Sequence, residues 1–337
     1  MRDRPEVSVV LPAFDAGATL GVALGSVRRQ TLTRFECIVV DDGSRDDTAD
    51  VARRVARVDD RFRVLSRPHR GIVAALGAGL DACRAPFVAR MDADDLMRRD
   101  RLAVQTDRLR ADPSLAAVGG HVRLFPRSVL GRGWRSYETW LAGITTPGDV
   151  EREAFVECPV AHPTLTARAD VIKTLGWRDR PWPEDYDLVL RMLAGGHRLA
   201  VVARRLLSWR RGPGRLSERD PRYGDDGFTR CKAHFLARGL LAGSGRFRLW
   251  GYGHTGRALT RALAAEGIAP ERIVDVHPGR LDREIAGAPV VPPERIGAPD
   301  DGPPVLASVA HAGPRSEIRA FLTGRGFIEG THFVCVA

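Results

Sequence analysis

The stretch Pro86-Phe87-Val88-Ala89-Arg90-Met91-Asp92-Ala93-Asp94-Asp95 joins a short apolar run directly to three carboxylates. The run predicts a strand that ends at Asp92. Ligands of open parallel sheets bind beyond the carboxyl ends of the strands, so Asp92, Ala93 and Asp94 stand where a ligand would lie. Asp95 taken alone would serve as the N-cap of a helix that begins at Leu96.

The flanking sequence predicts the rest of a sheet. Apolar runs alternate with amphipathic or alanine-rich stretches, which is typical of an α/β fold with a doubly wound, mostly parallel sheet and right-handed crossovers. The expected strands are residues 7–11, 35–40, 63–65 and 86–91, and the expected helices are residues 18–30, 48–58 and 71–83.

A second predicted strand also ends in acids, at Asp41 and Asp42. Carboxylates gathered at one end of a sheet repel one another unless a cation or hydrogen-bond donors share them. Mg²⁺ or Mn²⁺ carrying a diphosphate would fit, because these ions are usually held by one or two carboxylates plus phosphate oxygens. Turn formation before Gly43 is the alternative role of Asp41 and Asp42.

A third acidic segment, Pro183-Glu184-Asp185-Tyr186-Asp187, opens an amphipathic helical run from Leu188. Acids in the first turn of a helix often only complement the helix dipole. Glu184 and Asp185 are therefore either dipole partners or candidates for proton transfer.

Taken in order, these segments resemble the inverting family-two glycosyltransferases of the GT-A fold. The resemblance covers about residues 5–217. It is carried by residues 7–50 and 71–102, Ala161-His162-Pro163, Gly176-Trp177-Arg178, the run PEDYDLVLRML from Pro183, and the closing LLSWRR…LS.

The resemblance implies a donor-binding role for the loops after the first two strands. Pro12, Ala13 and Phe14 correspond to the loop that holds the nucleobase, with Phe14 as the stacking ring. Asp42 corresponds to the carboxylate that accepts from a base N–H group, and Asp41 assists it.

The resemblance also implies where the chemistry occurs. Asp92 corresponds to the ribose contact, Asp94 to the metal ligand beneath the diphosphate, and Ala93 to the residue between them; Asp92 is the second candidate metal ligand. Asp185 corresponds to the general base, with Glu184 beside it. Glycosyl transfer passes through an oxocarbenium-like state, a divalent cation stabilises the leaving diphosphate, and a carboxylate accepts the acceptor's proton. A single displacement would invert the anomeric centre.

The chain departs from the family pattern at several positions. Phe14-Asp15 replaces the usual Tyr-Asn, and the histidine common near the end of the domain is missing from Trp209-Arg210-Arg211-Gly212. Arg210 or Arg211 is expected to supply the positive charge of that histidine to the diphosphate. His162 is expected to be a buried, hydrogen-bonded histidine and not a metal ligand.

A second motif lies near the C-terminus. Gly251, Gly253 and Gly256 form G-x-G-x-x-G after a predicted strand at residues 246–250 and before a predicted helix at residues 257–266, and Asp275 ends the next strand. This context predicts a Rossmann-like fold in which these residues could bind a nucleotide. Close helix–strand packing is the alternative reason for the glycines. No Tyr-x-x-x-Lys accompanies them, which disfavours a short-chain dehydrogenase or epimerase.

Composition predicts the domain boundaries. Residues 210–227 are rich in Gly, Pro, Arg and Asp, as expected of a linker. We expect a GT-A-type domain at residues 1–217, a linker and bridging helix at residues 218–243 (the helix near residues 228–241), and a smaller Rossmann-like domain at residues 244–337.

The net charge of +10 comes almost entirely from arginines dispersed along the chain, since Lys173 and Lys232 are the only lysines. This one-sided use of arginine favours a base-composition bias of the genome as the source of the charge, ahead of an anionic small substrate and far ahead of nucleic acid, so no nucleic-acid partner is expected. The five cysteines are far apart and predict buried free thiols in a reducing compartment. No apolar run approaches the roughly 20 residues of a membrane span, so a cytoplasmic protein, at most peripheral to the inner membrane face, is expected.

The sequence thus predicts an enzyme that moves a sugar from a UDP- or dTDP-type nucleotide-diphosphate-sugar donor to a hydroxyl of a glycan or lipid-linked acceptor, in surface glycan or polysaccharide biosynthesis. A sugar nucleotidyltransferase is disfavoured because Leu11-Pro12-Ala13-Phe14-Asp15 is not a Gly-rich basic loop. A non-catalytic nucleotide- or glycan-binding scaffold stays open. So does a bifunctional enzyme whose C-terminal domain modifies the sugar.

Overall fold

The computed structural model describes residues 4–212 and 214–337. Within them the chain forms two compact units. The first unit holds the residues up to Val150, Val160–Arg180 and Asp187–Arg215. The second unit holds Glu151–Pro159, Pro181–Tyr186 and Leu216–Ala337. A single cut in the sequence therefore does not separate the two units.

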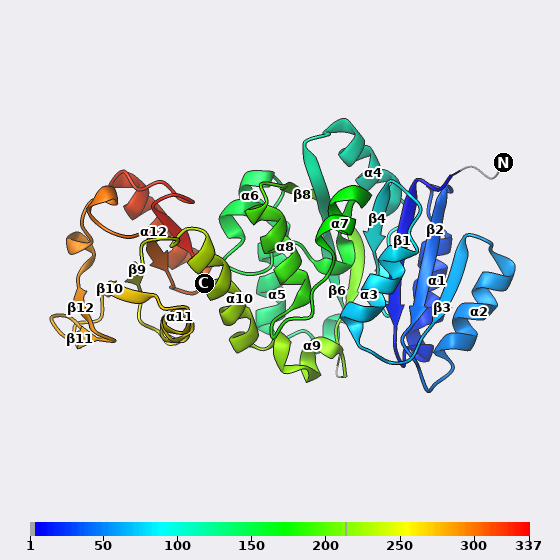
Figure 1. The fold of residues 1–337 in the computed structure, drawn as a ribbon, viewed down its shortest axis with the longest axis horizontal. Coiled ribbons are helices and arrows are strands. Elements are labelled where there is room, and N and C mark those ends of the chain that lie inside the picture. Colours follow the sequence, from blue (N-terminus) through cyan, green and yellow to red (C-terminus); the bar gives the residue numbers. More distant parts are fainter. Residues whose placement is uncertain (1–3, 213) are drawn as a thin grey trace. The chain divides into compact units, whose positions relative to one another are not determined.

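An eight-stranded mixed sheet forms the centre of the first unit (Figure 1). Its strand order is β3-β2-β1-β4-β7-β6-β8-β5. Strands β3, β2, β1 and β4 run parallel, and β7 joins β4 in the antiparallel sense. The strands are β1 (Val7–Ala13), β2 (Phe35–Asp41), β3 (Phe62–Ser66), β4 (Phe87–Arg90), β5 (Leu96–Met97), β6 (Leu115–Phe125), β7 (Thr166–Arg168) and β8 (Arg198–Arg210).

Helices cover both faces of the parallel half of this sheet, which is why most positions of its strands are apolar. Val9 and Val39 pack with Leu24 of α1 in one buried cluster. On the opposite face α3 approaches β1 so closely that a Cβ on Gly79 would lie 2.6 Å from Val10 Cγ1. The helices up to residue 215 are α1 (Gly17–Arg28), α2 (Thr48–Val58), α3 (Ile72–Asp81), α4 (Arg101–Ala111), α5 (Arg132–Ala142), α6 (Pro147–Glu153), α7 (Ala169–Leu175) and α8 (Glu184–Ala194).

The expected strands and helices of residues 7–91 are present, and the predicted doubly wound α/β fold is confirmed. The prediction of a helix that begins at Leu96 was wrong. Leu96 and Met97 instead form the edge strand β5, where Leu96 pairs with Ser208 of β8, and helix α4 begins at Arg101. Asp95 is therefore not a helix cap.

A second, six-stranded sheet has the order β11-β12-β10-β9-β13-β14. Strands β9, β10, β12, β13 and β14 run parallel, as expected of a Rossmann-like unit. The strands are β9 (Arg246–Trp250), β10 (Ala269–Val274), β11 (Glu284–Ile285), β12 (Ala288–Val291), β13 (Val305–Ala307) and β14 (Phe333–Cys335). The helices are α9 (Leu216–Arg219), α10 (Asp225–Arg238), α11 (His254–Ala265) and α12 (Ala312–Gly324).

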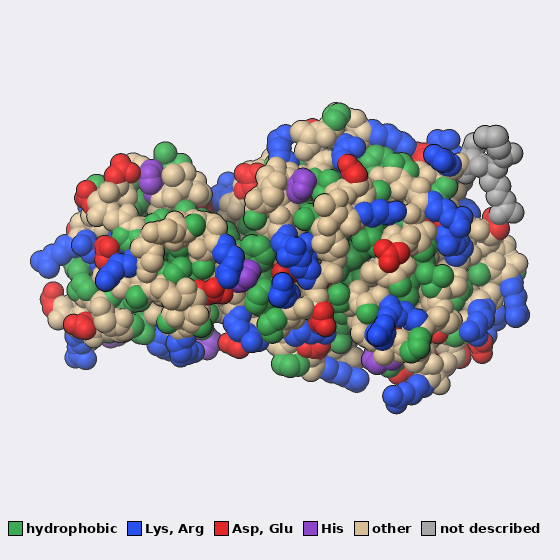
Figure 2. Space-filling view, in the orientation of Figure 1, with side chains coloured by type: hydrophobic (Ala, Val, Ile, Leu, Met, Phe, Trp, Pro, Cys, Tyr) green, Lys and Arg blue, Asp and Glu red, His purple; other side chains and the backbone are tan. Residues whose placement is uncertain are grey.

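Basic side chains are scattered over the face seen in Figure 2, among acidic and apolar ones, and do not gather in one patch. All five cysteines are buried and free, as predicted. Burial raises the pKa of the Cys83 thiol to about 12, so this thiol stays protonated. Among the described residues, no helix combines the length and apolarity that crossing a membrane requires.

Candidate active site

The loop after β1 meets the loop after β2 at the carboxyl edge of the sheet. Asp15 has a φ of +46°, a left-handed conformation that Asp tolerates better than most residues. Its N–H group donates to Ser44 Oγ at 3.0 Å, and its Oδ1 accepts from the Arg45 N–H group at 2.8 Å. Phe14 is 39% exposed and stacks on the ring of His69, with centroids 4.0 Å apart. The residue predicted to stack on a base thus carries an accessible ring held beside an imidazole.

Asp42 is buried and binds the segment that follows β3. Its carboxylate accepts from the backbone N–H groups of Gly71, at 2.8 Å, and Arg70, at 3.2 Å. Nδ1 of His69 lies 2.8 Å and Nε of Arg67 lies 3.3 Å from the same carboxylate. Asp42 therefore joins the loop after β2 to the loop after β3, in addition to any contact with a base.

Asp41, Pro12 and Ala13 are fixed by the sheet itself. Pro12 pairs with Val40 and Ala13 with Asp41 in the parallel register of β1 and β2. Asp41 Oδ1 accepts from the Ser44 N–H group at 3.1 Å. Gly43 between them has a φ of +77°, and a Cβ there would lie 2.7 Å from the His69 nitrogen, so glycine is required at this turn.

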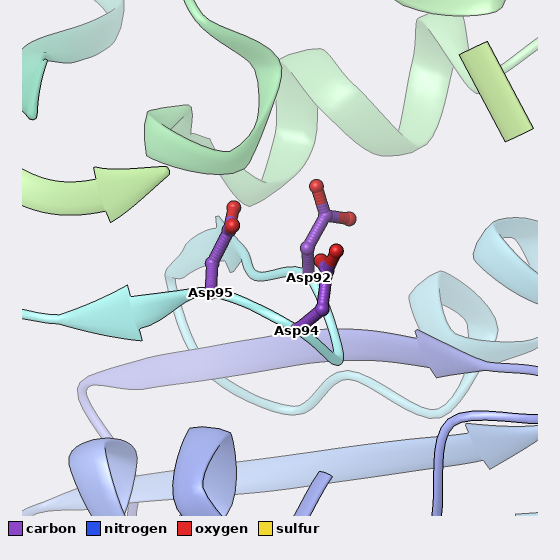
Figure 3. Close-up of side chains that lie close together, drawn as sticks. All are labelled: Asp92, Asp94 and Asp95. Carbon is purple, nitrogen blue, oxygen red and sulfur yellow. The ribbon is translucent and has the colours of Figure 1, made fainter. Parts of the chain in front are cut away.

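Asp92, Asp94 and Asp95 gather directly after β4. One carboxylate oxygen from each lies within 4.8 Å of the others, and Figure 3 shows the three side chains projecting from the same side of the loop. Asp95 is fully buried. Its Oδ1 accepts from the Arg210 N–H group at 2.7 Å, whereas its Oδ2 is buried without a hydrogen-bond partner. Burial, with the nearby Asp94 charge, raises the pKa of Asp95 to about 7.

Arginines surround this acidic cluster. Arg90 is buried and pairs with Asp92. Arg215 lies 3.5 Å from Asp92 and 3.5 Å from Asp94. Arg210, which we expected to face the diphosphate, donates from Nε to the backbone oxygen of Asp94 at 2.8 Å and so holds the loop.

Arg215 is not among the predicted site residues, because it lies in the Gly/Pro/Arg-rich segment at residues 210–227, whose composition indicates a domain boundary. Arg211, the other arginine considered for the diphosphate, is buried, with its guanidinium carbon 3.4 Å from the centroid of Trp134.

His162 lies inside the protein, as expected of it. Its Nε2 accepts from Nε1 of Trp177 at 2.9 Å. Burial, together with the Arg90 charge, lowers the pKa of His162 well below its usual value, so the ring stays neutral. The pairing joins the two short motifs Ala161-His162-Pro163 and Gly176-Trp177-Arg178.

Glu184 and Asp185 occupy the first turn of α8, in a segment that belongs to the second unit. Glu184 is buried and accepts a hydrogen bond from the Tyr223 hydroxyl. Burial and the Glu184 charge raise the pKa of Tyr223 far above its usual value, so it remains a donor. Asp185 is only partly buried. Asp187, the next acid, bonds Arg191 Nε at 2.6 Å and is part of the helix packing.

The G-x-G-x-x-G segment connects β9 to α11. Gly251 has a φ of +91°, and a Cβ on Gly256 would lie 2.2 Å from the Gly251 carbonyl oxygen. Asp275 accepts from the N–H groups of Tyr252, at 3.3 Å, and His277, at 2.9 Å, and pairs with Arg280 at 2.7 Å. Gly253 is different, because no atom lies within 4 Å of a Cβ placed there.

A mixed sheet that starts with four parallel strands and carries an Asp-x-Asp loop after β4 defines the GT-A class of glycosyltransferase folds. Residues 8–171 match the family described as Glycosyl transferase family 2. The match places residues 8–171, which include the Asp92–Asp94 loop, in this family of glycosyltransferases.

Individual known proteins are similar to this chain over part of their length. A glycosyltransferase of Haemophilus influenzae of uncharacterised activity is 26% identical over 193 residues, which are 55% of this chain and 59% of that protein. Chondroitin synthase of Escherichia coli is 32% identical over 114 residues, which are 34% of this chain and 17% of the synthase. The chain thus spans three-fifths or less of the length of these relatives.

The fold is also that of solved glycosyltransferases. The crystal structure of S. aureus TarS residues 1–349 in complex with UDP-GlcNAc has a TM-score of 0.56 at 16% identity, covering 77% of this chain and 71% of that one. At this identity the likeness concerns the fold.

Proposed function

We propose that this chain is a glycosyltransferase that inverts the anomeric centre as it moves a sugar from a nucleotide-diphosphate donor, of the uridine or thymidine type, to an acceptor hydroxyl. The observation that carries the proposal is the cluster of Asp92, Asp94 and Asp95 at the end of β4. It lies in the half of the sheet where the loops after β1 and β2 present Phe14 and Asp42. TarS, which has this fold, is complexed with UDP-GlcNAc, which supports a donor of this class.

Asp94 and Asp92 are the proposed ligands of a divalent cation, Mn²⁺ or Mg²⁺. The residues fit such an ion, because hard cations prefer carboxylate oxygens and Asp95 Oδ2 is buried in the same cluster without a hydrogen-bond partner. When bound, the cation would act as a Lewis acid that stabilises charge on the leaving diphosphate.

The remaining roles belong to side chains of the protein. Phe14 offers its exposed ring to the base, and Asp42, fixed by its contacts to Gly71 and Arg70, offers its carboxylate to a base N–H group. Asp185 accepts the proton of the attacking hydroxyl. Glu184 is the weaker candidate for that step because its carboxylate is buried and bonded to Tyr223.

A glycan, free or lipid-linked, is the proposed acceptor, and surface glycan or polysaccharide synthesis is the proposed setting. The similarity to chondroitin synthase supports a carbohydrate polymer, although it extends over only 17% of that enzyme.

The test is a screen for donor hydrolysis across nucleotide-sugars with Mn²⁺ or Mg²⁺, read as released nucleoside diphosphate. We expect the wild-type chain to hydrolyse at least one donor and to stop in excess chelator. Asp94→Ala should abolish this activity while the chain stays folded, because the diphosphate would lose its Lewis acid. Asp107→Ala is the matched control, since the Asp107 side chain is 74% exposed on α4.

Each alternative predicts a different result of this screen. Full activity of Asp94→Ala, or in chelator, would contradict the metal assignment. A chain that binds donors but turns none over would be the non-catalytic scaffold. A released sugar whose mass has changed would instead identify a bifunctional enzyme.

A further inference from the structure

Arg215 lies against both acids of the Asp92–Asp94 pair. Its Nη2 is 3.5 Å from Asp92 Oδ2, and its Nε is 3.5 Å from Asp94 Oδ2. Its third nitrogen, Nη1, donates to the backbone oxygen of Arg210. Only 16% of the side chain is exposed. The guanidinium is thus held at three points, and its position is not that of a free surface arginine near an acid.

This ion pair conflicts with the binding of a cation to the same acids. A divalent ion on Asp92 and Asp94 would compete with Arg215 for carboxylate oxygens. Arginine cannot relieve the conflict by losing its proton, because a guanidinium stays charged in proteins. Two cations within a few Å repel strongly where the local dielectric constant is far below that of water. A metal that arrives alone must therefore displace Arg215 without offering it another anion.

A donor diphosphate supplies that anion. Its oxygens suit the planar fork of a guanidinium, which binds phosphate in a bidentate manner. We infer that Arg215 is the resident counter-ion of the Asp92–Asp94 pair and transfers to the diphosphate when a metal-bound donor enters. This inference rests on the proposed function and adds to it a diphosphate-binding residue that also couples the metal to the nucleotide.

The inference predicts that metal and nucleotide assist each other's binding. The free protein should bind Mn²⁺ weakly, since Arg215 pairs with both acids and Arg90 also pairs with Asp92. Uridine diphosphate should raise the affinity for Mn²⁺, and by linkage Mn²⁺ should raise the affinity for uridine diphosphate by the same factor. If Arg215 had only a structural role, removing its charge would change neither the binding of Mn²⁺ nor the effect of uridine diphosphate on that binding.

The experiment measures Mn²⁺ binding to the full chain by electron paramagnetic resonance of the free ion, with and without uridine diphosphate. Arg215→Gln removes the charge and keeps a polar side chain. We expect it to bind Mn²⁺ alone roughly tenfold tighter than wild type, since the repelling cation is gone. The gain in affinity caused by uridine diphosphate should shrink by a similar factor, because the nucleotide loses its arginine partner.

Two further variants separate charge from shape. Arg215→Lys keeps the charge but not the fork, so its affinity for Mn²⁺ alone should stay near that of wild type while the coupling to uridine diphosphate falls. Arg219→Gln removes the same charge from an exposed position on α9 and should behave as wild type in both measurements. Circular dichroism checks that each variant is folded. If Arg215→Gln does not fold, the inference is tested with Arg215→Lys.

The outcomes are distinguishable. If Arg215→Gln binds Mn²⁺ no tighter than wild type and keeps the same response to uridine diphosphate, the inference is overturned and Arg215 is a structural ion pair. The inference is also overturned if Arg215→Lys binds Mn²⁺ alone more tightly than wild type does. If wild type binds Mn²⁺ neither alone nor with uridine diphosphate, the proposed function itself fails.

Discussion

At the scale of single residues, the two acids that open α8 differ in what surrounds them. Glu184 is buried and accepts from the Tyr223 hydroxyl, which fits a side chain that holds structure. Asp185 is partly exposed. A general base must reach the proton of a bound acceptor, so accessibility favours Asp185.

Replacing Asp185 with Asn keeps the size of the side chain but removes its ability to accept a proton. We expect Asp185→Asn to lower sugar transfer by about 10²–10⁴-fold, the usual contribution of a positioned acid or base. Donor affinity, measured by calorimetry, should hardly change. Asp226→Asn is the control, since the Asp226 side chain is 85% exposed. Loss of donor binding in Asp185→Asn would assign this residue to the donor or the fold.

How far sequence predicts the site depends on the separation of the partners. Asp42, Asp92 and Asp94 follow apolar runs, and the end of such a run can be recognised locally. The residues that pair with these acids cannot be recognised from the local sequence. Arg215 is 123 positions from Asp92, and the N–H group bonded by Asp95 belongs to Arg210, 115 positions away. No local pattern contains such pairs, which is why Asp95 looked like a helix cap.

At the scale of elements, the same distinction holds for strands and helices. The parallel strands β1 to β4 are apolar on both faces and could be predicted from composition alone. The edge strand β5 has only two residues and exists because Leu96 pairs with Ser208 of β8. Its sequence favours a helix start, and a long-range pairing overrides that preference.

The turn from β9 to α11 gives an element-scale prediction. Gly256→Ala should destabilise the second unit by about 1–3 kcal/mol, because a Cβ 2.2 Å from the Gly251 carbonyl oxygen forces the helix away from the strand. Gly253→Ala should change stability by no more than about 0.5 kcal/mol, since nothing lies within 4 Å of its Cβ. Denaturant titration of both variants provides the comparison.

This pair of variants also distinguishes packing from ligand binding in the G-x-G-x-x-G segment. If the glycines serve packing, Gly253→Ala keeps both stability and transferase activity. If the segment holds a nucleotide, Gly253→Ala would no longer bind it, although the stability of the variant would be unchanged. In that case a nucleotide would raise the unfolding temperature of wild type but not that of Gly253→Ala.

At the scale of the whole molecule, the second unit is built from distant parts of the chain. Arg319 pairs with the buried Glu153 at 2.8 Å, and Lys232 donates to the backbone oxygens of Val156, at 2.7 Å, and Val336, at 3.0 Å. Phe155 packs against the core of the same unit. Composition places a linker at residues 210–227 but gives no sign that residues 151–159 belong with the C-terminal sheet.

A chain that ends at Leu241 tests how far the chemistry depends on that sheet. The proposed donor and metal residues all belong to the first unit, and Asp185 is retained as well, so we expect donor hydrolysis to survive. Stability should fall, because Glu153 would lose Arg319 and Phe155 would lose most of the core it packs on. Replacing one partner of a buried pair typically costs about 3–5 kcal/mol.

Thermal unfolding and donor hydrolysis of the shortened and full-length chains measure the two effects separately. A shortened chain that is well folded but hydrolyses no donor would show that the C-terminal unit takes part in the reaction, and a nicotinamide-type absorbance of the purified full-length chain would support the same conclusion.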